Sequence, residues 1–172
     1  MISLGCAKNL VDAELMLGSA KAEGFEITNN PAEADILVVN TCGFIDTAKQ
    51  ESIDAILEAN RQRDELRPDA RIVVSGCLSQ RYSGDLVNEL PEVDAFIGLD
   101  QVAEAGRIFR KVLEEKSPGV MNLVTPKSRY IPDFSTPRFR LTPAHSAYVK
   151  IAEGCNHPCS FCVIPQMRGR HR

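Results

Sequence analysis

The feature that most constrains the fold is an arrangement that occurs three times in the first half of the sequence. A short apolar run ends in glycine or threonine, a cysteine follows, and a segment with helical spacing of apolar residues comes next. The three cysteines are Cys6, Cys42 and Cys77, separated by 36 and 35 residues. Alternating strands and helices predict an α/β fold with a doubly wound, mainly parallel sheet of about five strands. Because the carboxyl ends of parallel strands share one edge, we expect the three thiols to meet there.

Apolar runs and helix stops predict the individual elements of this sheet. The runs at residues 35–40 and 71–75 contain consecutive apolar residues, which is typical of strands buried on both faces. Shorter strands are expected at residues 2–4, 25–28 and 95–97. Helices are expected to end at Gly24, Pro68 and Pro91, and a further helix is expected from about residue 102 to residue 115. Together these elements predict a first domain over residues 1–116.

The composition changes after this domain. Five of the 10 prolines fall between Pro118 and Pro143, which predicts an extended connector over residues 117–144. Residues 147–151 then alternate between apolar and polar side chains, as the first strand of a barrel would. A cysteine-rich loop follows this strand, where a barrel active site is expected. Residues 145–172 are therefore predicted to begin a second domain.

This loop holds the other three cysteines, Cys155, Cys159 and Cys162, in the spacing C-x3-C-x2-C. Three thiolates can hold a 4Fe-4S cluster and leave one iron free to bind a small molecule. A zinc site is the alternative, with His145 or His157 as fourth ligand, although zinc sites favour paired C-x2-C knuckles. A disulfide with one spare thiol would require an oxidising compartment.

Phenylalanine and cysteine also occur in ordinary apolar cores, so the residues of these motifs have a second, purely structural interpretation. Phe161, which directly precedes the last cysteine, favours the iron–sulfur interpretation but also suits an apolar core. Cys6, Cys42 and Cys77 could equally be buried as small apolar residues, although their shared position after a strand argues for a common role.

Composition limits the classes of protein to which the chain can belong. With 172 residues, 44% of them apolar and 25% charged, it is typical of a soluble globular domain. No apolar run approaches the roughly 20 residues of a membrane span, and the first residues lack the pattern of an export signal. We therefore expect a cytoplasmic protein without a membrane partner, in which cysteines serve as metal ligands or reactive thiols. The net charge of −3 argues against strong nucleic-acid binding by this part.

The residues around each cysteine resemble the RimO-type radical S-adenosylmethionine methylthiotransferases. The opening motif is residues 3–12 (SLGCAKNLVD), with Ala7 where proline is commoner in the family. The second and third motifs are residues 40–45 (NTCGFI) and 76–82 (GCLSQRY). Residues 151–155 (IAEGC) lead into the radical motif, and Ile164-Pro165 and Arg168-Gly169 follow it. The resemblance extends along nearly the whole chain.

The resemblance implies two 4Fe-4S clusters and no catalytic protein side chain. The cluster that cleaves S-adenosylmethionine would be held by Cys155, Cys159 and Cys162, with Phe161 beside the adenine. An auxiliary cluster, whose free iron binds the sulfur to be inserted, would be held by Cys6, Cys42 and Cys77. An electron donor such as flavodoxin or ferredoxin is the implied redox partner.

The implied reaction places a methylthio group on the β-carbon of an aspartate in a small-subunit ribosomal protein, the twelfth. A radical can remove hydrogen from this unactivated carbon, whereas no general base does so at neutral pH. The residues at 43–46 and 78–80 favour this substrate over an adenosine of transfer RNA, which is the alternative within the family. A stand-alone cluster-binding or zinc-binding structural or docking module is the alternative from another class.

The sequence ends 10 residues after Cys162. A complete barrel would need on the order of 200 further residues. We therefore expect the first domain to fold, only a truncated barrel to follow it, and no turnover from these residues alone.

Overall fold

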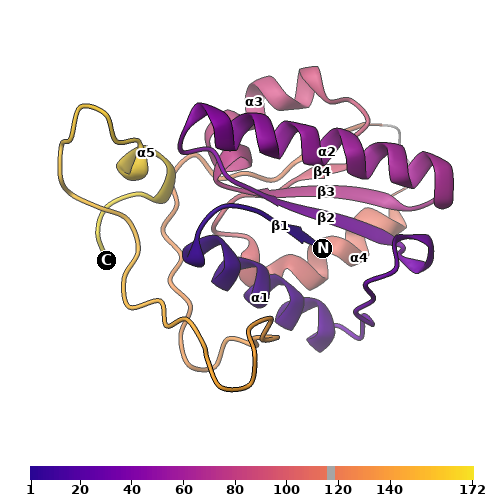
Figure 1. Ribbon diagram of the computed structural model, residues 1–172, viewed down its shortest axis with the longest axis horizontal. Helices are drawn as coiled ribbons and strands as arrows, with labels where there is room; N and C mark the ends of the chain where they lie inside the picture. Colours follow the sequence, from indigo (N-terminus) through magenta and orange to yellow (C-terminus); the bar gives the residue numbers. More distant parts are fainter. Residues whose placement is uncertain (116–118) are drawn as a thin grey trace.

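The computed structural model describes residues 1–115 and 119–172, and its centre is a five-stranded sheet in which all strands run parallel (Figure 1). The strands lie in the order β1-β2-β3-β4-β5. They are β1 (Ile2–Ser3), β2 (Ile36–Thr41), β3 (Arg71–Gly76), β4 (Ala95–Phe96) and β5 (Met121–Asn122). The predicted α/β fold with a parallel sheet of about five strands is confirmed.

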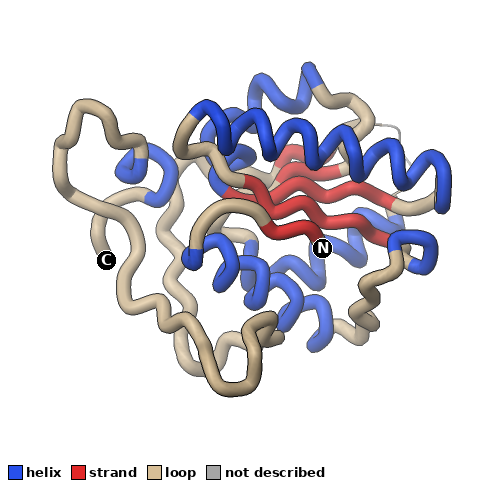
Figure 2. The backbone as a smooth tube through the Cα atoms, in the orientation of Figure 1, coloured by secondary structure: helices blue, strands red, loops and turns tan. Residues whose placement is uncertain are grey.

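Helices cover both faces of the sheet (Figures 1 and 2). One face carries α1 (Ala7–Ala22) and α4 (Ala105–Glu114), the latter preceded by the 3-10 turn η2 (Val102–Glu104). The other face carries α2 (Asp46–Leu66) and α3 (Cys77–Glu89), and a second 3-10 turn, η1 (Pro31–Glu33), leads into β2.

The two apolar layers explain why β2 and β3 are continuous apolar runs. Side chains alternate between the faces of a strand, so Val38 and Val73 pack against α1 and α4. Val39 and Val74 point the other way and pack against α2 and α3. Both strands are thus buried on both sides, as their sequences predict.

The register of the sheet brings the three cysteine loops to one edge. β2 and β3 are paired from Ile36 opposite Arg71 to Thr41 opposite Gly76, so both strands end side by side. Ser3 of β1 pairs with Asn40, and the next backbone bond, from Leu4 N to Asn40 O, is 2.9 Å long. Each cysteine follows one of these strand ends, which confirms their predicted position at the carboxyl edge of the sheet.

The predicted strand at residues 25–28 is wrong. These residues form a loop in which Phe25 N donates to Ala20 O at 3.1 Å, and the Phe25 ring packs edge-on against Phe109 with centroids 6.2 Å apart. Phe25 packs against the core, whereas Ile27 is exposed, and no strand among the described residues pairs with this segment. The fifth strand is β5 instead, where Met121 N donates to Asp94 O and Leu123 N to Phe96 O, both at 2.9 Å.

The expected barrel strand at residues 147–151 is also absent from the described part of the chain. A strand requires a neighbour for its backbone groups, and in residues 1–115 and 119–172 no strand pairs with this segment. Val149 and Ile151 are accordingly 78% and 92% exposed.

A long segment without regular structure joins β5 to the short helix α5 (Ile164–Arg168) (Figure 2). Part of it lies along α1, where Phe139 N donates to Glu14 O at 2.9 Å and Leu141 N donates to Glu14 Oε1 at 2.7 Å. The predicted boundary between residues 116 and 117 lies outside the described residues, and so does Pro118. No helix in the described ranges combines the length and apolarity that a membrane crossing requires.

Candidate functional site

The first group of thiols, here called the N-terminal triad (Cys6, Cys42 and Cys77), lies on three loops that touch one another. Cys6 is the N-cap of α1, Cys42 directly follows β2, and Cys77 is the first residue of α3. A Cβ placed on Gly5 would lie 3.1 Å from Cys42 Sγ, so the first two loops are in close contact. A Cβ on Gly43 would lie 2.9 Å from the backbone N of Leu78, which brings the third loop equally near. Glycine is required at both contacts because a side chain would separate the loops.

Ser52 of α2 holds the second of these loops. Its hydroxyl accepts a hydrogen bond from Cys42 N at 2.9 Å and donates one to Cys42 O at 3.0 Å. Ser52 is fully buried and Cys42 is partly buried, so both bonds are partly shielded from water. The backbone of Cys42 is therefore fixed by side-chain contacts from a different element.

Cys77 is the buried member of the N-terminal triad. Its side chain packs with Leu99 and Met167, and its Sγ donates to Asn9 Oδ1 at 3.4 Å. Burial raises the pKa of the Cys77 thiol from 9.0 to about 11, although the nearby Arg168 guanidinium acts in the opposite direction. Cys77 is thus a neutral thiol at neutral pH in the metal-free chain.

The second group, here called the C-terminal triad (Cys155, Cys159 and Cys162), lies on a loop closed at its base by backbone hydrogen bonds. Cys155 N donates to Gly169 O at 3.1 Å, and Glu153 and Arg172 exchange two backbone bonds of 2.9 Å. Cys159 is exposed, and the other two are partly buried. The ring of Phe161 is 84% exposed, so it is not a core aromatic residue here.

Neither triad is arranged as a finished ligand set. Among the residues that the structure describes, no group of three or more His, Cys, Asp or Glu side chains has the arrangement of a metal site. All six cysteines are free thiols. Their role as cluster ligands therefore stays a prediction, as does that of Phe161 beside a nucleoside.

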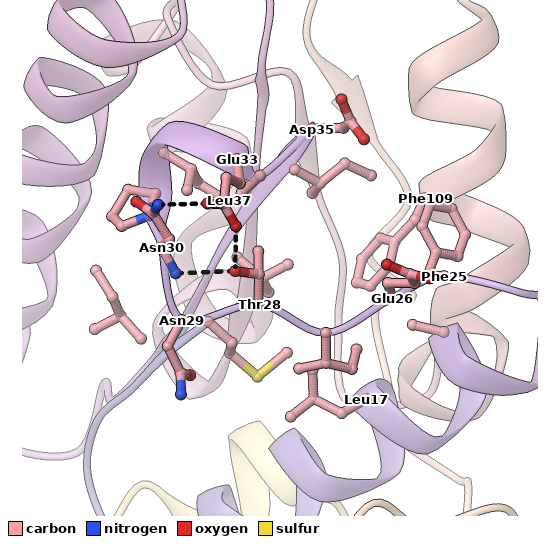
Figure 3. A pocket seen from close by; sticks show the side chains of 18 of the residues that line it. Leu17, Phe25, Glu26, Thr28, Asn29, Asn30, Glu33, Asp35, Leu37 and Phe109 are labelled. Atoms are coloured by element: carbon pink, nitrogen blue, oxygen red, sulfur yellow. Dashed lines mark hydrogen bonds between the residues drawn. The ribbon is translucent and has the colours of Figure 1, made fainter.

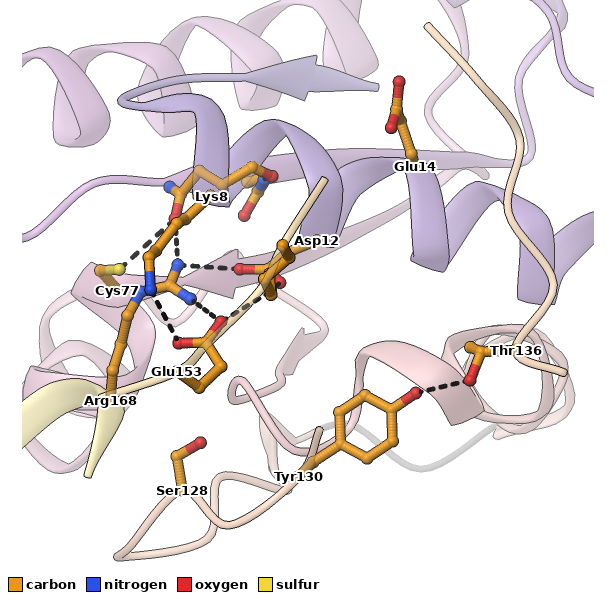
Figure 4. Close-up of polar contacts among 12 residues, drawn as sticks. Lys8, Asp12, Glu14, Cys77, Ser128, Tyr130, Thr136, Glu153 and Arg168 are labelled. Atoms are coloured by element: carbon orange, nitrogen blue, oxygen red, sulfur yellow. Dashed lines mark hydrogen bonds and ion pairs between the residues drawn. The ribbon is translucent and has the colours of Figure 1, made fainter. Parts of the chain in front are cut away.

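A buried ionic network joins helix α1 to the segment that carries the C-terminal triad, and Figure 4 shows Asp12, Glu153 and Arg168 of this network close to Cys77. Arg168 of α5 donates to Asp12 Oδ2, Glu153 Oε1 and Asn9 Oδ1, each at 2.8 Å. Lys150 lies 2.7 Å from Glu153 Oε1 and also pairs with Asp12. The charged side chains of these four residues are at most 6% exposed. We call Asp12, Lys150, Glu153 and Arg168 the ionic network.

The charges in this network stabilise one another. Burial alone would raise the pKa of Glu153, but Arg168 and Lys150 outweigh it and hold that pKa below its ordinary value. Burial would likewise lower the pKa of Arg168, but Asp12, Cys77 and Glu153 raise it above its ordinary value. Both side chains are therefore charged at neutral pH.

Asp12 and Arg168 are parts of sequence motifs, but their positions in those motifs did not predict a role for either residue. The available signal was the composition of α1, whose central residues are nearly all buried, so that Asn9 and Asp12 had to meet polar partners inside the protein. The charged partners of Asp12, which are Lys150 and Arg168, were not visible because they lie more than 130 residues away along the chain.

A cavity of about 520 Å³ lies away from both triads (Figure 3). Leu17, Phe25 and Phe109 line its apolar side, and Thr28, Asn30 and Glu33 are hydrogen bonded to one another at its mouth. It opens at the start of β1 and β2, whereas the cysteines follow the opposite ends of the strands. We place the candidate site at the cysteines, because no thiol lines this cavity.

Proteins similar in sequence to this chain carry the name of the methylthiotransferase group that its cysteine motifs resemble. Two similar proteins, one from Akkermansia muciniphila and one from Opitutus terrae, are both named "Ribosomal protein uS12 methylthiotransferase RimO". Each is 52% identical to this chain over its whole length. A protein of the same name from Caldicellulosiruptor saccharolyticus is 47% identical over 99% of it. The chain spans only 38% of the length of each of these relatives.

The sequence model of a protein family matches the domain that carries the N-terminal triad. The match covers residues 1–98, which include β1 to β4, helices α1 to α3 and all three cysteines of that triad. This is more than half of the sequence. The chain therefore belongs to the family described as "Uncharacterized protein family UPF0004".

Proposed function

We propose that this chain is the cluster-binding part of a methylthiotransferase, and that the whole protein adds a methylthio group to the β-carbon of an aspartate in ribosomal protein uS12. The observation that carries the proposal is the presence of two triads of free cysteines, joined by one buried network, in a chain about half identical to proteins of that name. Since the chain spans 38% of those relatives, the activity is assigned to the longer protein.

The donor set suits iron–sulfur clusters. Soft thiolates are the usual ligands of such clusters, and each triad offers three cysteines. The loops of the N-terminal triad are in close backbone contact. Arg168 places a positive charge beside Cys77, which favours the thiolate that a metal requires. When bound, the cluster of the C-terminal triad would supply the electron that cleaves S-adenosylmethionine, and that of the N-terminal triad would carry the sulfur to be transferred.

Other residues of the chain would orient these ligands. Ser52 keeps the Cys42 backbone in place through its two hydrogen bonds. The exposed ring of Phe161 is free to pack against the adenine of S-adenosylmethionine, next to Cys162. We further propose a cytoplasmic reaction, with a flavodoxin or ferredoxin as electron donor.

Analysis of iron and acid-labile sulfide after anaerobic reconstitution tests the cluster assignment. We expect about eight irons per chain, four for each triad. Replacing Cys42 with serine should halve the iron content, and replacing Cys159 should halve it independently. Zinc bound without sulfide would contradict the proposal and support the structural-module alternative.

Two further measurements test the activity and the substrate. A longer chain that contains these 172 residues should form 5'-deoxyadenosine from S-adenosylmethionine under reduction, whereas we expect none from this chain alone. Mass spectrometry of ribosomal protein uS12 and of transfer RNA from a deletion strain then distinguishes the substrates. Loss of a methylthio group from transfer RNA, with uS12 unchanged, would replace our assignment with the adenosine alternative.

A further inference from the structure

Within the ionic network, Arg168 contacts residues that lie beside both triads. Arg168 is 2% exposed and lies on α5, only a few residues after Cys162. Its guanidinium enters the first domain and contacts Asn9 and Asp12 of α1, which are 159 and 156 residues away along the chain. The same guanidinium also bonds Glu153, two residues before Cys155.

On the side of the N-terminal triad, one acceptor links Arg168 to a thiol. Asn9 Oδ1 accepts from Arg168 Nη2 at 2.8 Å and from Cys77 Sγ at 3.4 Å. Asn9 itself is held in place, because its amide donates to Thr41 O at 2.7 Å and to Leu4 O at 3.1 Å. Arg168 is therefore one hydrogen-bonded residue away from Cys77, and Figure 4 shows the two lying close together.

Apolar contacts strengthen the same connection. Met167, the neighbour of Arg168, is 1% exposed and packs with Cys77 and Leu99. Val163 and Ile164 pack against the edge of this cluster. The helix that follows the C-terminal triad is thus seated directly on the buried member of the N-terminal triad.

The chemistry of the contact favours a role in positioning rather than in overall stability. Buried ion pairs are costly to desolvate, and apolar residues of similar volume often stabilise a protein as well or better. Charged groups add geometric specificity instead, because each hydrogen bond from a guanidinium has a defined geometry and breaks when its acceptor shifts. A network of four buried charges therefore selects one placement of α5 on α1.

We propose that Arg168 is a positioning residue that fixes the distance and orientation between the two triads. This role rests on the proposed function in one respect, which is that the triads hold clusters. The contacts of Arg168 themselves require no metal. They can therefore be tested both in the metal-free chain and in the reconstituted chain.

In the metal-free chain, amide hydrogen exchange reports on the connection. Arg168→Met removes the charge but keeps much of the length, and we expect the Glu153, Cys155 and Arg172 amides to exchange about tenfold faster or more. Amides of β2 and β3 should keep their protection. Arg168→Lys keeps the charge and should restore part of the protection. The control, Arg170→Met, changes an exposed arginine in the same segment and should have no effect.

In the reconstituted chain, magnetic coupling between the two reduced clusters reports on their separation. Arg168→Met should alter the dipolar broadening of their electron paramagnetic resonance signals without changing the iron content. Arg168→Lys should bring the broadening back toward that of the unsubstituted chain. A role in stability alone would not produce this pattern.

The proposal is overturned if Arg168→Met leaves the exchange of the three amides unchanged, or accelerates β2 and β3 equally. Unaltered coupling between two fully formed clusters would also overturn it. If no iron is bound at all, the proposed function fails, while the exchange experiment still decides whether Arg168 connects the two segments.

Discussion

Cys77 shows how strongly the surroundings of a single residue depend on a distant part of the chain. Apolar neighbours raise the pKa of its thiol to about 11, and one of them, Met167, comes from the far end of the sequence. The charge of Arg168 acts against this shift. A metal bound at Cys77, as we propose, would have to displace the proton of a thiol that the protein keeps neutral, and the neighbouring Arg168 cation would favour the resulting thiolate.

The stability of the metal-free chain should consequently depend on pH through Cys77. The folded state favours the protonated thiol, so the resulting stabilisation is complete below pH 9.0 and is lost as the pH rises through about 11. We expect the free energy of unfolding to fall by on the order of 3 kcal/mol more than in Cys77→Ala over this range. Urea unfolding at several pH values measures it. Equal pH dependence in the two proteins would contradict the buried-thiol assignment.

At the scale of elements, the strands and helices around the N-terminal triad follow from local pattern. The apolar runs of β2 and β3 are long enough to identify buried strands, and the cysteines after them mark the ends correctly. Residues 25–28 and 147–151 have similar alternation, yet neither segment is a strand in the described structure. Alternation does not ensure burial, since Val149 and Ile151 are exposed. A strand also needs a paired neighbour, which a local pattern cannot reveal.

Ser52 is an element-scale contact that can be tested by substitution. Ser52→Ala removes both hydrogen bonds between α2 and the Cys42 backbone and leaves the partly buried Cys42 N–H without its acceptor. We expect a loss of about 1–3 kcal/mol in the free energy of unfolding and faster alkylation of Cys42. Mass spectrometry after timed alkylation measures the second effect.

Thr47→Ala provides the matched control for Ser52, because Thr47 is an exposed hydroxyl residue on the same helix. It should leave both the stability and the alkylation rate of Cys42 within error of the original. An unchanged alkylation rate in Ser52→Ala would show that the loop is held by other contacts.

At the scale of the whole molecule, helix α1 contacts three other parts of the chain, which are α4, the connector and the segment that carries Arg168. One part of it meets the ionic network through Asn9 and Asp12, and Ser19 accepts a hydrogen bond from Gly106 N of α4 at 3.0 Å. Between them, Glu14 binds the connector, with Arg138 Nε and Leu141 N as donors to its carboxylate, both at 2.7 Å. A helix with partners on all sides has little amphipathic character, which is why its sequence alone did not indicate which face is solvated.

Removing the Glu14 carboxylate should release the connector from α1. Glu14→Ala removes the acceptor of Arg138 Nε and of the Leu141 N–H, so trypsin should cut after Arg138 or Arg140 about tenfold faster. Gel electrophoresis of a timed digest measures the rate. Glu26→Ala, at an exposed glutamate, is the control and should not change it. Similar rates for all three proteins would mean that Glu14 does not hold the connector.

The sequence by itself determined the α/β class, the two buried central strands and the edge of the sheet at which three cysteines gather. These follow from local hydrophobic pattern and from the fixed direction of parallel strands. Only the tertiary structure decided that β5 completes the sheet and that Arg168 meets Asp12 across 156 residues. The physical reason is that strand pairing and buried charge pairing join groups distant in sequence, whose individual residue types are compatible with many partners.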